Sequence, residues 1–359
     1  MTSTLRTPAI LCLLVVLAAA GNAQRAAQAQ AKPAAGAADA TSSIVSAARA
    51  LVATLDEAGK TKVQFPFEGP QRTRWSNLPV GIFERQGLRM GDLTPPQREA
   101  ATKLLQSALS ADGYRKVMDI VRGDEILRAG SGRGDGRGGG GRGPGGGRGV
   151  TFGEAEYFLA FLGTPSTTTP WMLQFGGHHL AINLTLAGTQ ASMTPSLPAA
   201  QPATYTFEGR EIRPLGKEND KAFALVNALD PALRDQAILK YRVSDLVLGP
   251  GQDGRVIQPE GLRASSMTPA QQEMLLEIVR EWAGIMNDAF AGPRMAEIRS
   301  NLAQTHFAWS GPTTNGSVAY FRVQGPTLVI EYAPQNSVDH IHTIYRDPTN
   351  DYGAKLVSK

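Results

Sequence analysis

The sequence predicts an α+β fold, in which an antiparallel sheet packs against helices within a single domain. Helical and strand-like patterns come in separate blocks rather than in strict alternation, which is typical of this class. The strand-like segments are short and separated by turn residues, so consecutive strands are expected to pair in antiparallel fashion. The 359 residues are 42% hydrophobic and 19% charged, which excludes a disordered chain and a coiled coil. No internal repeat is evident.

Helices are predicted where apolar residues recur at three- and four-residue spacing behind a capping residue. The clearest pattern covers residues 267–291, with Thr268 as the cap and Pro269 in the first turn. Further helices are expected at residues 44–55, 94–109, 114–127 and 215–240, and after Pro293.

Strands are predicted where polar and apolar residues alternate between turn signals. Residues 171–194 alternate around Gly176-Gly177 and Ala187-Gly188, which predicts two or three antiparallel strands. The C-terminal part is again rich in strands, at residues 305–310, 318–323, 327–332 and 340–345.

The first residues are typical of a secretory signal peptide. Arg6 precedes an apolar run over residues 9–20, and small residues follow as far as Ala23. The run is too short to span a membrane, so we expect a signal peptide over residues 1–23, cleaved after Ala23. The mature protein would then be exported, periplasmic or secreted, without a membrane contact. Cys12, the one cysteine, lies in this segment, so no disulfide or thiolate ligand is expected in the mature chain.

Two segments of biased composition flank or interrupt the predicted domain. Residues 24–40 are rich in Ala and Gln and predict a disordered leader before a globular domain over residues 41–359. Residues 130–149 contain thirteen glycines interleaved with arginines, which predicts a flexible surface insertion. Such runs can bind RNA, but the net charge is only +4, and we expect no nucleic-acid partner. RNA binding through this insertion stays as a third hypothesis.

A pair of histidines near the C-terminus predicts a metal site. In Asp339-His340-Ile341-His342, strand alternation places His340 and His342 on one face, where two imidazoles can share a metal ion. Glu331 is the only charge in the preceding apolar strand, and a hairpin would bring it close to the pair as a fourth ligand or general base. Two surface histidines on a half-exposed sheet are an equally open interpretation.

Two adjacent histidines, His178 and His179, follow a glycine pair and could supply a third ligand. Adjacent residues on a strand face opposite ways, so at most one of them is expected to join the site. The other would form a hydrogen bond in the core or orient its neighbour. His306 is expected to be a packed or hydrogen-bonding residue.

A polar cluster follows the second histidine of the C-terminal pair. Arg346 is expected to hold an anionic or polar group of a substrate, and Asp347 to act as a base or as a supporting residue. The alternative is a loop with local hydrogen bonds, because Asp before Pro favours turns.

Several motifs taken together resemble one known family. GGHHLAIN, THFAWSGP, QGPTLVIEY and DHIHTIYRDPTNDYG are similar to the family called domain of unknown function 3500, and the similarity spans residues 41–353. The resemblance implies a single domain that is often exported, without an established activity. It directs attention to His178, His179, Glu331, His340, His342, Arg346 and Asp347. Gly177 departs from the family pattern, in which an acidic residue precedes the histidine pair.

From these observations we expect an exported metal-dependent enzyme, with hydrolysis of a small-molecule substrate as its chemistry. His340 and His342 would bind a divalent ion together with His178 or His179, with zinc the expected metal and copper or iron as alternatives. The ion would lower the pKa of a bound water molecule to about 7. Whether the protein is an enzyme is left open, because a non-catalytic exported protein that binds a small molecule would use the same polar cluster.

Overall fold

The structure is a computed structural model that describes residues 34–131 and 149–357. The predicted signal peptide and most of the Gly/Arg-rich insertion lie outside these residues, as does the leader up to residue 33. The rest of the leader differs from the prediction, because helix α2 (Ala34–Ala53) begins there and buries Ala37. No helix in the described part of the chain is long and apolar enough to cross a membrane.

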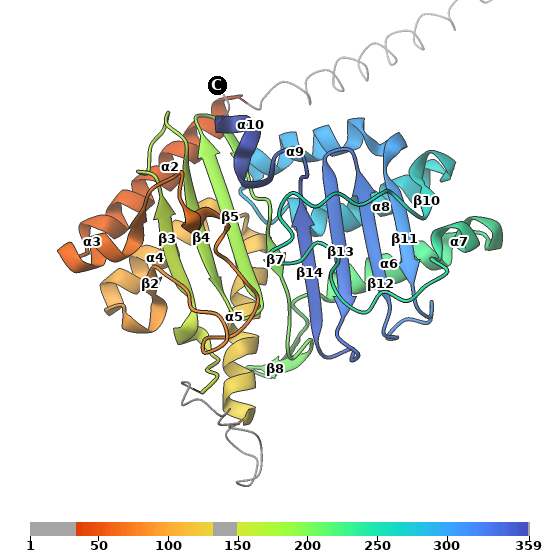
Figure 1. Cartoon of the computed structure of the whole chain (residues 1–359), viewed down its shortest axis with the longest axis horizontal. Coiled ribbons are helices and arrows are strands. Elements are labelled where there is room, and N and C mark those ends of the chain that lie inside the picture. Colours follow the sequence, from red (N-terminus) through yellow and green to blue (C-terminus); the bar gives the residue numbers. More distant parts are fainter. Residues whose placement is uncertain (1–33, 132–148, 358–359) are drawn as a thin grey trace, which may run out of the picture.

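Two sheets lie edge to edge in the middle of the molecule (Figure 1). The first contains β1 (Gln64–Phe65), β2 (Leu88–Arg89), β3 (Phe158–Leu162), β4 (Trp171–Gly177), β5 (Leu180–Ala187), β6 (Gln190–Ser192) and β7 (Leu197–Pro198). The second contains β10 (Leu262–Arg263), β11 (His306–Ser310), β12 (Tyr320–Gly325), β13 (Leu328–Pro334) and β14 (Ile341–Arg346), in this order. A small separate hairpin consists of β8 (Tyr205–Phe207) and β9 (Arg210–Ile212).

The strand that joins the two sheets places the candidate site. β7 pairs with β5, and the chain around it forms bridges to β14, between Ser196 and Tyr345 and between Ala200 and Ile341. Figure 1 shows β7 between β5 and β14. β1 pairs with β3 in parallel, and the other pairs within the two sheets are antiparallel. The predicted α+β class with antiparallel sheets in a single domain is therefore confirmed.

The helices pack on one face of the strands and two long connections cover the other (Figure 1). The helices on this face are α2, α3 (Glu57–Val63), α4 (Pro95–Ala108), α5 (Ala111–Ser131), α6 (Gly216–Ala228), α7 (Pro231–Ala237), α8 (Pro269–Ala283) and α9 (Asp288–Ser300). The short C-terminal α10 (Ala354–Val357) lies on the other side of the strands, near β5. The connections run from β1 to β2 and from α7 to β10. They supply Trp75 and Leu246 to a third cluster of apolar residues, which includes Ile344 of β14.

The chain contains an internal duplication that the sequence analysis did not detect. In the first half, two helices, two strands, two more helices and three strands follow one another, in the order α2, α3, β1, β2, α4, α5, β3, β4, β5. The second half has the same order with one strand fewer: α6, α7, β10, α8, α9, β11, β12, β13. No strand of the second half corresponds to β1. Ile238 takes this place there, because it forms a parallel bridge to Trp309 of β11. Leu109 after α4 and Met286 after α8, at equivalent places in the two halves, form a bridge with each other.

The duplication is also visible in one pair of sequence segments. Residues 87–99 (GLRMGDLTPPQRE) and 261–273 (GLRASSMTPAQQE) share seven of thirteen positions. Thr94 and Thr268 both form capping boxes with a glutamine three residues later. Gly87 and Gly261 both have positive φ, and a Cβ there would lie 2.5 and 2.3 Å from a carbonyl oxygen of the neighbouring strand. Local backbone demands of this kind account for the shared glycine, threonine and glutamine.

The predicted helix over residues 267–291 is two helices in the structure. α8 ends at Ala283, where Gly284 caps it, and α9 begins at Asp288 behind the side chain of Asn287. The apolar pattern continues across the break because Ile285 and Met286 are buried between the two halves. Pro293 lies inside α9 instead of before a further helix.

Candidate metal centre

His178 and His179 form the two-residue turn between β4 and β5. The strands pair up to Gly177 and Leu180, so both histidines lie at the hairpin tip and not on a strand face as expected. His179 has a φ of 60°. The sequence analysis took the turn to be at the two preceding glycines, whereas Gly176 and Gly177 are in β4.

Main-chain hydrogen bonds hold this turn in place. The amide of His179 donates to the carbonyl oxygen of Asn77 at 3.1 Å, and its own carbonyl oxygen accepts from Ala199 at 2.8 Å. The hydroxyl of Tyr157 donates to the carbonyl oxygen of His178 at 2.7 Å. Both histidines are buried. The two rings therefore project from a fixed part of the backbone.

His340 and His342 lie at the start of β14, and their side chains face the same way. Ile341 between them is part of the core beneath the helices, as strand alternation predicts. The Nε2 atoms of His340 and His342 are 3.1 Å apart. Both rings are partly exposed, so solvent reaches this side of the site.

His179 joins this pair across the junction of the two sheets. Its Nε2 atom lies 3.0 Å from Nε2 of His340. One ring nitrogen from each of His179, His340 and His342 lies within 4.8 Å of the others, and this is the only such group of three or more possible metal ligands in the described part of the chain. We call these three residues the histidine cluster. Of the two adjacent histidines, His179 and not His178 belongs to it.

The surroundings of His179 and His340 favour neutral imidazoles. Burial lowers the pKa of His179 well below its usual value, and the neighbouring histidines lower it further. Burial and the charge of His342 lower the pKa of His340 to about 4. A neutral ring carries a lone pair on one nitrogen, which is the form that binds a metal ion.

Asp245 and Asn77 contact the two nitrogens of the His342 ring. Oδ1 of Asp245 lies 3.2 Å from Nδ1, and Nδ2 of Asn77 lies 3.2 Å from Nε2. Burial raises the pKa of Asp245, but hydrogen bonds from His342 and from the Leu246 amide outweigh this effect and bring it below the usual value. A charged carboxylate at Nδ1 requires the ring proton there, so the lone pair of His342 is on Nε2, toward the histidine cluster.

His178 supports the cluster from behind. Its ring stacks on that of His179 with centroids 3.7 Å apart. Its Nδ1 lies 2.6 Å from Oδ1 of Asp124, a buried residue of α5 whose second oxygen accepts from the Gly153 amide. Asp124 thus fixes the orientation of His178, and His178 fixes that of His179. This is the orienting role that the sequence analysis allowed for one of the two adjacent histidines.

Glu331 is on the same face as His342 but does not contact the histidine cluster. It is fully buried, and its carboxylate accepts from the amides of Val247 and Leu248 at 2.9 and 2.8 Å and from the hydroxyl of Tyr320 at 2.7 Å. These donors satisfy it, so it does not take a histidine or a metal ion as a partner. The prediction is corrected accordingly: Glu331 anchors the connection that carries Asp245.

Arg346 is also committed to this connection instead of to a substrate. It is 3% exposed and donates to the carbonyl oxygens of Leu248 and Gly249. Its NH1 group contacts the carboxylates of Asp253 and Asp351 at 3.0 and 2.8 Å. The guanidinium nitrogens of Arg346 thus all have partners within the protein. The expected role in holding an anionic substrate has no support in this geometry.

Asp347 and His306 lie away from the histidine cluster. Asp347 is buried, accepts from the amide and hydroxyl of Thr349, and contacts NH1 of Arg294 at 3.1 Å. This is the local loop bonding that the alternative interpretation predicted. Nδ1 of His306 contacts the carbonyl oxygen of Gln304, which agrees with a hydrogen-bonding role.

The sequence analysis missed the three polar residues that complete the site. Asn77 is in a segment, Trp75-Ser76-Asn77-Leu78-Pro79, that carries no chemical motif. Asp245 is in a long connection without a periodic pattern. Asp124 is an acidic residue whose 1% exposure marks it as a buried partner, but on the sequence it looks like any helical aspartate.

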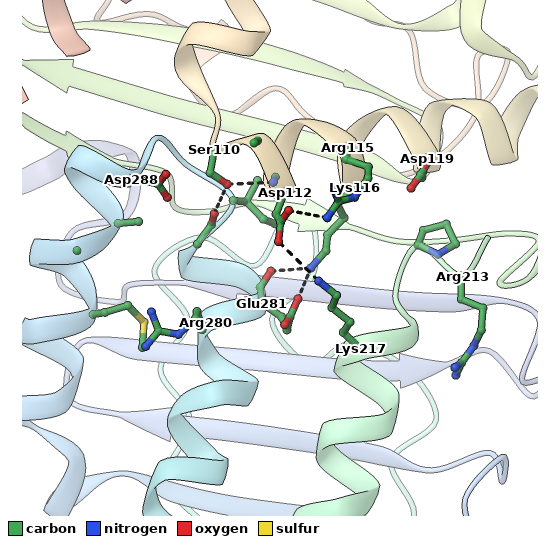
Figure 2. Close-up of a pocket in the computed structure, with 18 residues that line it drawn as sticks. Ser110, Asp112, Arg115, Lys116, Asp119, Arg213, Lys217, Arg280, Glu281 and Asp288 are labelled. Carbon is green, nitrogen blue, oxygen red and sulfur yellow. Dashed lines mark hydrogen bonds and ion pairs between the residues drawn. The ribbon is translucent and has the colours of Figure 1, made fainter. Parts of the chain in front are cut away.

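A separate pocket of about 610 Å³ lies in the helical layer, where α5, α8 and α9 of the two halves meet (Figure 2). Several of its charged side chains form ion pairs within the protein. Lys116 bonds to Glu218 at 2.5 Å and to Glu281 at 3.1 Å, and Arg115 bonds to Asp112. We assign no function to this pocket.

The fold and the histidine cluster define an α+β domain with three converging imidazoles at the junction of two sheets. The chain belongs to the family described as Protein of unknown function (DUF3500), whose model matches residues 37–354. The resemblance seen in the sequence is therefore confirmed. Comparison with curated proteins and with solved structures gives no match. The family description names no activity, so function must be argued from the site.

Proposed function

We propose that this protein is an exported metal-dependent enzyme in which His179, His340 and His342 bind a divalent ion, and that its chemistry is hydrolysis of a small-molecule substrate. The observation that carries the proposal is the convergence of three imidazole nitrogens from two distant parts of the chain, with Asp245 bonded to the outer nitrogen of His342. A carboxylate behind a histidine is the usual support of a metal ligand.

The spacing of the nitrogens fits a metal ion. Zinc binds imidazole at about 2.0–2.1 Å, so two ligands of a tetrahedral ion lie about 3.3 Å apart. The Nε2 atom of His340 is 3.0 Å from Nε2 of His179 and 3.1 Å from Nε2 of His342. The third pair, His179 and His342, lies within 4.8 Å, so these two rings would move closer together when an ion binds.

Hydrogen bonds among the three rings are a poorer explanation of their approach. Asn77 already donates to the lone pair on Nε2 of His342, and a single proton on Nε2 of His340 can serve only one of its two neighbouring rings. A shared ion satisfies the three inward lone pairs at once, which favours the enzyme over the non-catalytic binding protein.

The number of ligands supports a catalytic site over a structural one. Structural zinc sites have four protein ligands, whereas catalytic sites have three and leave one position open. An ion in such a site lowers the pKa of water to about 7 and supplies hydroxide near neutral pH. His340 and His342 are partly exposed, so a substrate can approach from solvent. Zinc is the metal we propose, with copper or iron as alternatives because imidazole binds all three.

The proposal of export depends on the N-terminal sequence alone. Arg6, the apolar run over residues 9–20 and the small residues before Ala23 fit a signal peptide. Expression of the full chain in a bacterium, with mass spectrometry of the secreted or periplasmic product, would test it. We expect the mature protein to begin at Gln24, and intracellular protein with an intact N-terminus would contradict export.

The enzymatic part is tested with metal-loaded protein and a panel of small esters, amides and phosphate esters. We expect the zinc-loaded protein to hydrolyse at least one class, the chelated protein to be inactive, and His342→Ala to be inactive while folded. His306→Ala is the matched control, because His306 is a histidine of the second sheet outside the cluster. Hydrolysis that survives both chelation and His342→Ala would contradict the proposal.

A further inference from the structure

We infer that Asn77 is the hydrogen-bond donor that holds a substrate oxygen beside the histidine cluster, and that the substrate presents a carbonyl or carboxylate oxygen there. This inference rests on the proposed metal site and names the chemistry of the group that the site receives. It concerns a residue that no sequence motif indicated.

The side-chain amide of Asn77 and a metal ion would compete for the same lone pair, the one on Nε2 of His342. Nδ2 of Asn77 lies 3.2 Å from Nε2 of His342. Because Asp245 keeps the proton on Nδ1, Nε2 has the only lone pair of this ring, and it is the atom that would bind the ion. When His342 binds a metal ion, Asn77 therefore loses its acceptor.

A donor released in this position needs a new acceptor. Asn77 is 7% exposed, and a buried donor without a partner costs about 1–3 kcal/mol. Its Nδ2 atom lies at the distance from His342 Nε2 that separates neighbouring ligands of one ion, about 3.3 Å. It is thus well placed to donate to the oxygen atom of a ligand that enters the open side of the cluster.

The main chain at Asn77 is fixed beside the histidine cluster. Its carbonyl oxygen accepts from the amide of His179, which ties it to the hairpin that carries the first ligand. Arg85 adds a clamp, because its NH2 group lies 2.7 Å from each of three carbonyl oxygens, those of Ser76, Leu78 and Gly177. Arg85 is therefore a positioning residue, and Asn77 is held against the cluster from both sides.

A fixed amide donor beside a metal site selects ligands with an accepting oxygen. Such donors are most effective where negative charge develops on an oxygen during reaction, as in acyl transfer. Within the proposed hydrolytic chemistry this favours esters, amides or other acyl compounds. Acetate is the simplest probe, because it presents the same oxygen without reacting.

The test measures acetate binding to the cobalt-loaded full chain by visible absorption, with cobalt content determined separately. We expect Asn77→Ala to retain about one equivalent of cobalt and to bind acetate about tenfold more weakly, the loss of one hydrogen bond to a charged group. Asn315→Ala is the matched control, because Asn315 is exposed and bonded only to Asn219. It should bind acetate as the wild type does.

A second variant guards against misfolding of the first. Asn77→Asp keeps the size of the side chain but replaces the donor by a carboxylate, so it should bind acetate even less well than Asn77→Ala while retaining cobalt. Acetate affinity within about twofold of wild type in both variants would overturn the inference. So would loss of cobalt from Asn77→Ala, because Asn77 would then be a ligand itself. A wild-type chain that takes up no cobalt would instead contradict the metal site, before acetate is added.

Discussion

The carboxylate of Asp245 contacts Nδ1 of His342 at 3.2 Å, although 97 residues separate them in the chain. The opposite nitrogen of the same ring faces Nε2 of His340 at 3.1 Å. The carboxylate of Asp245 thus holds the His342 ring from the side away from the cluster, and the ring presents the lone pair of Nε2 to the other histidines. The relationship depends on the connection between α7 and β10, which crosses the second sheet and is itself anchored by Glu331.

Asp245→Asn should weaken metal binding without abolishing it. The amide removes the charge that fixes the His342 tautomer, and loss of such a partner typically costs 10–100-fold in metal affinity, roughly. Competition with a chromophoric chelator measures the change. Asp235→Asn is the control, because Asp235 is an exposed partner of Lys240 and should leave the affinity unchanged. Equal affinities for the two variants would contradict the supporting role of Asp245.

His178→Ala and His179→Ala should differ sharply although the residues are adjacent. His179 is a proposed ligand, whereas His178 stacks on it and bonds to Asp124. We expect His179→Ala to lose the metal and His178→Ala to keep about one equivalent with affinity lowered by roughly tenfold. Metal analysis of both folded variants gives the answer. Loss of metal from His178→Ala alone would reverse the assignment of the two residues.

Glu331→Ala should lower stability more than it changes the metal content. The substitution leaves the buried Leu248 amide, the partly buried Val247 amide and the Tyr320 hydroxyl without an acceptor, at about 1–3 kcal/mol for each group. The three groups together amount to about 3–9 kcal/mol, and at about 2 °C per kcal/mol the Tm should decrease by roughly 6–18 °C. Folded Glu331→Ala protein that no longer binds metal at saturating concentration would show that Glu331 is a ligand, against this account.

Lys116→Met should destabilise the protein, and more so at high pH. Lys116 pairs with the fully buried Glu218, whose pKa is raised by burial and held down by the lysine. Without the lysine this pKa rises further. A carboxyl with a folded pKa above its unfolded value stabilises at low pH and loses that stability as the pH rises through the folded pKa.

The free energy of unfolding of Lys116→Met should therefore be only slightly below that of the wild type at about pH 4.5. The difference should grow to about 3–5 kcal/mol toward about pH 8. Urea unfolding over this pH range measures it. Lys103→Met is the control, because the pair of Lys103 and Glu99 is exposed to solvent and should contribute little to stability at any pH. A deficit that is independent of pH would contradict the role given to Glu218.

The sequence was sufficient for the fold class and for much of the secondary structure. Capping boxes at Thr94 and Thr268 and the alternation in the C-terminal strands are local signals, and local signals can be found in one sequence. The duplication was missed because it preserves positions of elements more than residues. Its clearest trace, residues 87–99 and 261–273, is short compared with the halves that it relates.

The site was predicted only as far as strand alternation reaches. His340 and His342 could be paired because two residues on one strand share a face. The choice of His179 over His178 depends on a turn geometry and on Asp124 of a distant helix, which the sequence does not show. The predicted role of Glu331 was wrong because a lone charge in an apolar strand implies a partner but does not identify it. Here the partners include two backbone amides.

The most direct test of the proposed metal site is elemental analysis of the purified full chain and of His340→Ala, before and after chelation. Nε2 of His340 contacts both other rings, so this residue is central to the cluster. We predict about one equivalent of zinc, copper or iron in the wild type and in His306→Ala, and none in folded His340→Ala. Wild-type protein that holds no metal and takes up none on reconstitution, or equal metal in His340→Ala, would contradict the account.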